Sequence, residues 1–267
     1  MDLETVATYR RATSRADLAL APGERFVAGG TWLYSEPQVG TSGLVDLTGM
    51  GWASIEEHDG GLRIGATCTI AELVAHAVGA AWPAHPLVSD CANALLASFK
   101  VWNSATVGGN VCRAFAAAGM VSLCTTLDGV ATIWTPDGGE ERRPVVDLVA
   151  GNGVTTLADG EVLRAIDLPA HALRARTAFR KIALAELGRS GAVLTGRVDG
   201  DGAATLVITA ATERPTVLRF DRLPDAATLR SVVEAAPGYY SDPLGSADWR
   251  RAVSVALLED VREELAA

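Results

Sequence analysis

Hydrophobic positions change their spacing several times along the chain, and the change predicts an α+β fold. Short apolar or alternating runs, typical of strands, occur at residues 25–28, 44–47, 54–57, 62–65 and 130–134. Longer stretches with helical spacing lie between them, at residues 69–83, 87–101 and 111–127. Thr69 and Glu72 form a capping box at the start of the first of these helices, and Pro83 ends it.

The second half of the chain has a different pattern. Strands are expected at residues 162–168, 178–184, 192–198, 205–211 and 216–220, followed by a helix that Ser246 caps and whose apolar residues share one face. Residues 147–161 carry three glycines and no clear period, which indicates a linker. We therefore predict one domain at residues 1–155 and a smaller antiparallel sheet with helices at residues 156–267.

Adjacent glycine pairs occur four times, about as often as 27 glycines in random order would give. Gly60-Gly61 and Gly138-Gly139 each follow an aspartate between strand-like runs, which predicts hairpin turns. The other two pairs follow apolar residues and precede Thr31 and Asn110. A glycine pair can reach positive φ and lets a ligand approach its N–H groups, while hydroxyl and amide side chains can donate to phosphate. From residues alone, a ligand loop and a plain tight turn both remain open at these two positions.

Composition narrows the classes of function. The formal net charge of −9 argues against a nucleic-acid or anionic-membrane surface, because both need clustered basic residues. The start of the chain lacks a secretory pattern, and the uncharged run at residues 114–127 is too short to span a bilayer, so a cytoplasmic protein is expected. The four cysteines and four histidines form no metal-ligand motif, and no catalytic motif is present, so we expect neither a metal site nor catalytic side chains.

Three motifs carry a resemblance to a known family. Val27-Ala-Gly-Gly-Thr31, Thr106-Val-Gly-Gly-Asn110 and Leu127-Asp-Gly-Val-Ala-Thr132 resemble the FAD-binding subunit of molybdenum hydroxylases, the xanthine dehydrogenase and carbon monoxide dehydrogenase family. The resemblance implies a two-part FAD-binding domain of the PCMH type in the first part of the chain. It also implies that the flavin receives electrons from an iron–sulfur subunit, which serves a molybdopterin-binding large subunit, and passes them to an acceptor such as NAD or oxygen.

The same resemblance assigns site residues. The first loop would hold the pyrophosphate side of FAD, the second loop would face it, Leu163 would contact the flavin region, and Lys181 would lie close to the cofactor. Lys181 also has a plain interpretation as a surface lysine on a strand. The complete set is Val27, Ala28, Gly29, Gly30, Thr31, Trp32, Leu33, Thr106, Val107, Gly108, Gly109, Asn110, Gly119, Leu163 and Lys181.

The run after Asn110 departs from the family pattern. Members commonly have a Ser-Pro stretch and then an aspartate that bonds the flavin's ribityl chain, whereas this chain has Cys112-Arg-Ala-Phe-Ala-Ala-Ala-Gly119, with Gly119 near the position of that aspartate. Two outcomes follow: a repositioned flavin with Arg113 as a new contact, or a scaffold subunit that has lost its cofactor. A stand-alone flavin oxidase is a further alternative, which would need its own substrate pocket and base.

Overall fold

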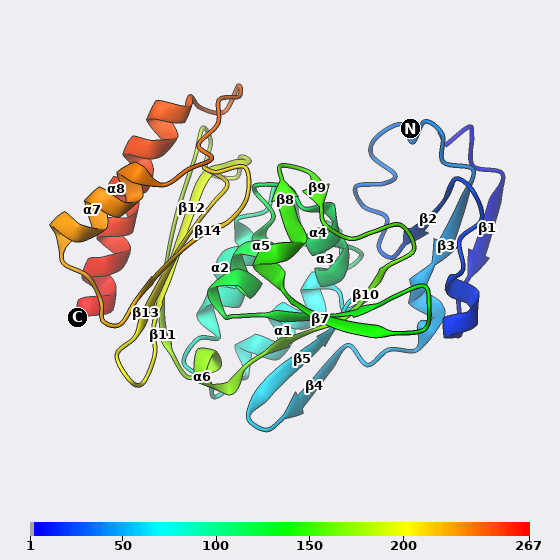
Figure 1. The fold of residues 1–267 in the computed structure, drawn as a ribbon, viewed down its shortest axis with the longest axis horizontal. Coiled ribbons are helices and arrows are strands. Elements are labelled where there is room, and N and C mark those ends of the chain that lie inside the picture. The colour runs from blue at the N-terminus through cyan, green and yellow to red at the C-terminus, as the bar shows by residue number, and fades with distance from the viewer. Residues whose placement is uncertain (1–2) are drawn as a thin grey trace.

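The computed structural model describes residues 3–267 and arranges them as three sheet-based units in a row (Figure 1). The first unit is a parallel sheet in which β3 (Gly43–Asp46) lies between β1 (Thr8–Arg11) and β2 (Glu24–Val27). Two 3₁₀ helices complete it, η1 (Arg15–Leu18) and η2 (Leu47–Met50). Its β2 strand leads directly into the first glycine pair.

The second unit is a five-stranded antiparallel sheet. Its order is β4 (Ile55–His58), β5 (Gly61–Gly65), β10 (Val162–Leu168), β6 (Val130–Trp134) and β7 (Glu140–Pro144). Both Asp-Gly-Gly segments are confirmed as hairpin turns, between β4 and β5 and between β6 and β7. Asp59 and Gly60 both have positive φ, as the favoured two-residue hairpin turn requires.

Short helices cover the apolar face of this sheet and form the main core with it (Figure 1). They are α1 (Ile70–Val78), α2 (Pro86–Asn93), α3 (Phe99–Trp102), α4 (Val107–Arg113) and α5 (Gly119–Thr126). The capping box of α1 is confirmed, since Thr69 Oγ1 accepts from the Glu72 N–H and the Glu72 carboxylate accepts from the Thr69 N–H. The helix predicted at residues 87–101 is interrupted between α2 and α3, and Ala114, in the left-handed region with φ of 54°, separates α4 from α5.

The third unit confirms the predicted C-terminal antiparallel sheet with helices. Strands β11 (Arg176–Ala183), β12 (Ser190–Val198), β13 (Ala204–Thr209) and β14 (Thr216–Phe220) follow one another, and α7 (Ala226–Ala235) and α8 (Ala247–Ala266) cover one face (Figure 1). The other face lies on the main core, where Ser122 and Thr209 share a buried hydroxyl–hydroxyl bond of 2.6 Å. The minor elements are η3 (Val145–Leu148), the two-stranded pair β8 (Val149–Gly151) and β9 (Val154–Thr155), and α6 (Ala170–Leu173).

One strand lies elsewhere than the sequence indicates. Residues 162–168 were expected with the C-terminal strands, but β10 pairs with β5 and β6 at the centre of the second sheet. A central strand is recognised by its neighbours, which are far away in sequence, so its local pattern cannot assign it to a sheet. This pairing favours a domain boundary after Leu168 over the predicted one at residue 155.

A buried ion-pair cluster joins the second and third units. Arg197 of β12 is 1% exposed; it donates to the Thr126 carbonyl at 2.7 Å and pairs with the carboxylate of Asp128. Arg219 of β14 reaches the same carboxylate at 2.7 Å. The two arginines hold the pKa of Asp128 at about 2 against the burial that raises it.

Within residues 3–267, no helix combines the length and apolar character needed to cross a bilayer.

Candidate functional site

The first glycine loop, residues 28–33, follows β2 and leaves its backbone donors open. Gly30 has a φ of 66°, which glycine adopts without strain, and its carbonyl accepts from the Tyr34 N–H at 2.8 Å. Among bonds between described residues, none uses the N–H groups of residues 29–33 as donors. Thr31 and Trp32 are exposed. This loop therefore presents a run of free N–H groups to a ligand.

The second glycine loop, residues 106–110, is closed by comparison, because it forms the first turn of α4. Thr106 is the N-cap, and its Oγ1 accepts from the Gly109 N–H at 3.0 Å. The N–H groups of Val107 and Gly108 donate to Cys68 and Ala66, and that of Asn110 donates to the Thr106 carbonyl. The expectation of a turn with positive φ is therefore wrong here: Gly108 and Gly109 are helical, and each N–H of residues 107–110 has a partner.

The two loops lie against each other. A Cβ placed on Gly29 would lie 1.7 Å from the carbonyl oxygen of Ser104, so the first loop packs on the backbone that leads into the second. Gly109 is exposed, and a Cβ there would meet only the Thr106 hydroxyl, at 2.8 Å. The face of Gly109 is therefore open apart from the Thr106 hydroxyl.

Asn110 and Gly119 connect α4 to α5. The Asn110 side-chain oxygen accepts from the Met120 N–H at 2.9 Å, which leaves its amide nitrogen as a donor. A Cβ on Gly119 would lie 2.1 Å from the Cys91 carbonyl of α2. Because α2 and α5 are this close, no acidic side chain fits at residue 119, and the departure noted in the sequence is built into the helix packing.

Arg113 lies beside the first loop, at the end of α4. Its guanidinium carbon is 3.8 Å from the centre of the Trp32 ring and 3.9 Å from that of Phe115. The two rings meet edge to face, with their centroids 6.0 Å apart. Sequence reasoning had named Arg113 as a contact but missed this stack, since nothing in the local pattern relates residues 32 and 113.

Two residues assigned by resemblance have other neighbours in the structure. Leu163 is 3% exposed and belongs to the main core. Lys181 Nζ donates to the Asn93 carbonyl at 3.3 Å and lies 3.5 Å from that of Glu186, and burial lowers its pKa. Lys181 is thus more than a surface lysine, because its side chain ties β11 to the end of α2. The flavin contacts of Leu163 and Lys181 stay predictions.

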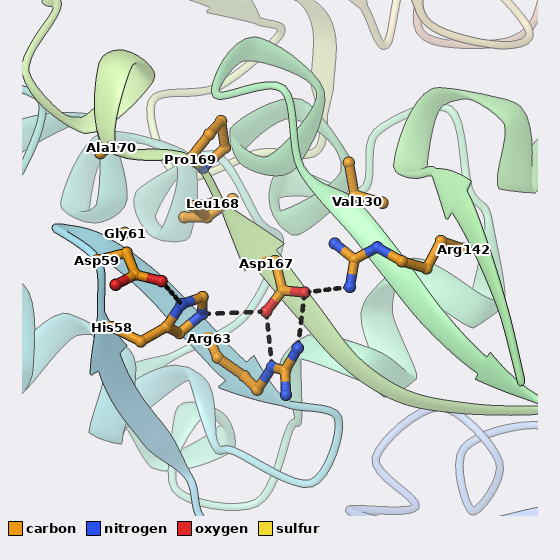
Figure 2. Close-up of a pocket in the computed structure, with 10 residues that line it drawn as sticks. All are labelled: His58, Asp59, Gly61, Arg63, Val130, Arg142, Asp167, Leu168, Pro169 and Ala170. Carbon is orange, nitrogen blue, oxygen red and sulfur yellow. Dashed lines mark hydrogen bonds and ion pairs between the residues drawn. The ribbon is translucent and has the colours of Figure 1, made fainter.

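A separate charged cavity lies on the polar face of the central sheet (Figure 2). It has a volume of about 310 Å³, and none of the residues predicted from the glycine loops lines it. Figure 2 shows His58, Arg63 and Arg142 converging on Asp167, with the Arg63 Nε and Arg142 Nη1 atoms each 2.7 Å from the carboxylate. The arginines lower the pKa of Asp167 against its burial. These donors satisfy the buried carboxylate, so the cluster is a cross-strand ion-pair network.

The cysteines are free thiols held in apolar surroundings. Burial raises the pKa of Cys68, Cys112 and Cys124 to about 12. At neutral pH these side chains are therefore protonated, whereas metal ligation and nucleophilic attack use the thiolate.

Comparisons with known proteins identify the family of this chain. Residues 4–171 match the family described as "FAD binding domain in molybdopterin dehydrogenase". The chain is 26% identical over 231 residues, 80% of this chain and 76% of the relative, to the putative xanthine dehydrogenase FAD-binding subunit XdhB of Escherichia coli K12. It is 29% identical over 177 residues, 61% of this chain and 58% of the relative, to the xanthine dehydrogenase FAD-binding subunit of Escherichia coli O157:H7.

Solved structures share the fold over almost the whole chain. A chain of reconstituted CO dehydrogenase from Oligotropha carboxidovorans superposes with a TM-score of 0.84 at 23% identity, covering 97% of this chain and 96% of that one. A chain of quinoline 2-oxidoreductase from Pseudomonas putida 86 gives 0.81 at 24% identity with the same coverage of each chain. The predicted fold class is confirmed. This chain therefore belongs to the FAD-binding domain family of molybdopterin dehydrogenases, as an oxidoreductase subunit whose cofactor is FAD.

Proposed function

We propose that this subunit holds FAD between its two glycine loops, receives electrons from an iron–sulfur subunit, and passes them to an external acceptor. The observation that carries the proposal is the contact of the open first loop, at Gly29, with the backbone that leads to the second. Residues 29–33 would face the pyrophosphate with their free N–H groups, while Gly109 leaves its face clear for close approach. Bound FAD supplies the redox chemistry, and the chain supplies position and charge.

The donor set suits an anionic dinucleotide. Free N–H groups of the first loop, the Asn110 amide nitrogen and the Arg113 guanidinium can all donate hydrogen bonds. Arg189 adds positive charge, with its guanidinium carbon 5.4 Å from the centre of the Phe115 ring. A chain of formal net charge −9 thus places two arginines around one ring beside the first loop.

We assign the supply of electrons to partner subunits because the four cysteines of this chain form no iron–sulfur ligand motif. The partners in the proposal are an iron–sulfur subunit and a molybdopterin-binding large subunit. NAD or oxygen would be the final acceptor. The free cysteines suit the reducing conditions of the cytoplasm.

Anaerobic reduction of the flavin tests the proposal. The chain is prepared alone and in complex with the iron–sulfur and molybdenum subunits encoded beside it, and the flavin absorbance at about 450 nm is followed after adding aldehydes or aromatic heterocycles. We expect bleaching only in the complex, and re-oxidation on adding NAD⁺ or oxygen. Bleaching of the isolated chain would instead support a stand-alone oxidase.

The FAD-less scaffold is the second candidate, and one observation favours it: the packing of Gly119 on Cys91 excludes the family's acidic ligand. The two candidates differ in a simple measurement. A scaffold would be colourless as purified and would not take up FAD, whereas the proposed subunit binds it.

A further inference from the structure

Arg113 is held firmly before any ligand arrives. Its guanidinium contacts the rings of both Trp32 and Phe115, and its Nη1 donates to the Gly153 carbonyl at 3.0 Å. The following backbone is fixed from two sides: the Asn152 side chain accepts from the Ala116 N–H at 3.0 Å, and the Ala116 carbonyl accepts from the Ala210 N–H at 2.7 Å. The guanidinium therefore has a defined place and orientation.

Its charge and part of its donor set are left without compensation. Nε is buried, and among the described residues neither Nε nor the accessible Nη2 has a hydrogen-bond partner. Burial lowers the pKa of Arg113, and the acid that opposes this shift, Glu36, acts through charge alone, without a hydrogen bond. A partly buried cation with an unused N–H is costly unless an anion pairs with it.

Arg113 shares a helix face with two residues of the second loop. Arg113 follows Gly109 by four residues and Asn110 by three, and side chains at these spacings share one face of a helix. The N–H groups of residues 107–110 are all occupied, so an anion lying over Gly109 receives no backbone donor from this loop. A side chain must provide the hydrogen bond there.

We propose that Arg113 is a phosphate ligand of this subunit: its Nη2 donates to a phosphate oxygen of the dinucleotide held between the glycine loops, while the Nη1 bond to Gly153 and the contacts with Trp32 and Phe115 hold the guanidinium in place. The inference rests on the proposed location of FAD. Arg113 would contact a phosphate of the cofactor. The acidic residue that does not fit at position 119 would have contacted the ribityl chain instead.

Binding of three probes tests it in the full-length chain freed of bound flavin. FAD and ADP both contain a pyrophosphate, whereas riboflavin has the isoalloxazine ring and no phosphate. Titration followed by flavin or tryptophan fluorescence and by calorimetry should show Arg113→Gln weakening FAD and ADP by about 10- to 100-fold, the range for a charge-assisted hydrogen bond. Riboflavin affinity should change less than about threefold, and the salt dependence of FAD binding should become shallower.

Two further variants separate the donor from the stack. Arg113→Lys keeps the charge but lacks the planar fork, so we expect intermediate affinity for FAD and ADP. Arg230→Gln removes an exposed arginine of α7, outside the two glycine loops, and should change FAD affinity less than about threefold. Melting temperature and circular dichroism of each variant report folding. If Arg113→Gln does not fold, the FAD and ADP affinities of Arg113→Lys and the salt dependence of wild-type FAD binding test the inference instead.

Equal FAD affinity in wild type and Arg113→Gln would overturn this inference and leave the proposed function intact. Equal weakening of riboflavin and ADP would also overturn it, because the residue would then act only by supporting the loop. A wild-type chain that binds neither FAD nor ADP would overturn the inference and the proposed site together. Selective loss of the phosphate-bearing probes is the result we expect.

Discussion

The loops at residues 28–33 and 106–110 share the sequence pattern of a Gly-Gly pair after an apolar residue and before a polar one, yet they use their backbone donors in opposite ways. In the first, the N–H groups of residues 29–33 have no partner among described residues. In the second, each N–H of residues 107–110 is bonded within the protein. The glycines differ as well, since Gly30 needs its left-handed backbone and Gly109 is helical.

The difference shows that a glycine pair marks close approach and does not say what approaches. At Gly29 the neighbour is the protein's own Ser104 carbonyl, while the face of Gly109 is free apart from the Thr106 hydroxyl. The first loop thus offers donors, and the second offers a fixed surface and side chains. Four comparisons of variants test this difference between the two loops.

The largest effect is expected from Gly29→Ala. Its Cβ would overlap the Ser104 carbonyl, so both loops must move apart, at a cost of about 3 kcal/mol in the free energy of unfolding. We expect a fall in melting temperature of about 5 to 10 °C and loss of bound flavin. Gly79→Ala is the matched control, because a Cβ there meets nothing within 4 Å and should change stability by less than about 0.5 kcal/mol. Similar effects of the two changes would disprove the contact between the loops.

Asp128→Asn comes next and shows whether flavin loss follows from instability alone. It leaves the buried Arg197 with weaker compensation, at a cost of about 3 kcal/mol, while asparagine still accepts the positive φ of this position. We expect a melting temperature lowered nearly as much as in Gly29→Ala, with flavin retained at 20 °C or below, roughly stoichiometric by absorbance. Flavin loss as complete as in Gly29→Ala would mean that the loops have no special role.

The pH dependence of that variant has a defined sign. The pKa of Asp128 is about 2 in the folded protein, below its ordinary value of 3.8. A lowered carboxylate pKa stabilises the fold fully above the ordinary value, and this contribution is lost as the pH falls through the folded value. The stability difference between wild type and Asp128→Asn should therefore be constant near neutral pH and shrink between about pH 4 and pH 2 in denaturant titrations.

Gly109→Val addresses the open face of the second loop. The added side chain would fill the space over the loop and meet only the Thr106 hydroxyl, so FAD affinity should fall at least about tenfold with a stability loss of about 1 kcal/mol. Gly139→Val is closely matched, since its Cβ would also lie 2.8 Å from a threonine hydroxyl, that of Thr135. FAD titrations of both variants decide the point, and equal weakening would show generic destabilisation.

The smallest effects separate the two threonines. Thr106→Ala removes the cap of α4 and should cost about 1 kcal/mol in urea unfolding. Thr31→Ala removes an exposed hydroxyl and should change stability by less than about 0.5 kcal/mol while weakening FAD a few-fold. The opposite pattern, with Thr31 stabilising the fold and Thr106 only the complex, would reverse the roles assigned to the loops.

The sequence correctly predicted the elements that depend on nearby residues or on a regular hydrophobic period. The Asp-Gly-Gly hairpins, the Thr69 capping box and the C-terminal sheet depend on neighbours in sequence or on strict periodicity, and each is confirmed. Thr106 before an apolar residue was an available N-cap signal for α4, and reading it would have shown that the second loop is helical.

The rest depends on long-range contacts that a single sequence does not display. The place of β10 at the centre of the sheet, the closeness of Gly119 to Cys91 and the stack of Arg113 on Trp32 each join residues far apart in the chain. The resemblance to a family named the loops but could not show which N–H groups are free. The membership of the candidate site stays a prediction, and the structure shows how the two loops use their N–H groups.

The contact between Gly29 and Ser104 also orders events during folding. It joins segments about 75 residues apart, and closing a chain of that length costs roughly 4 kcal/mol of entropy, which only a largely assembled second unit can offset. Strands and helices built from nearby residues form ahead of such closures. The two glycine loops therefore come together only in a largely folded molecule, and a nascent chain lacks the paired loops.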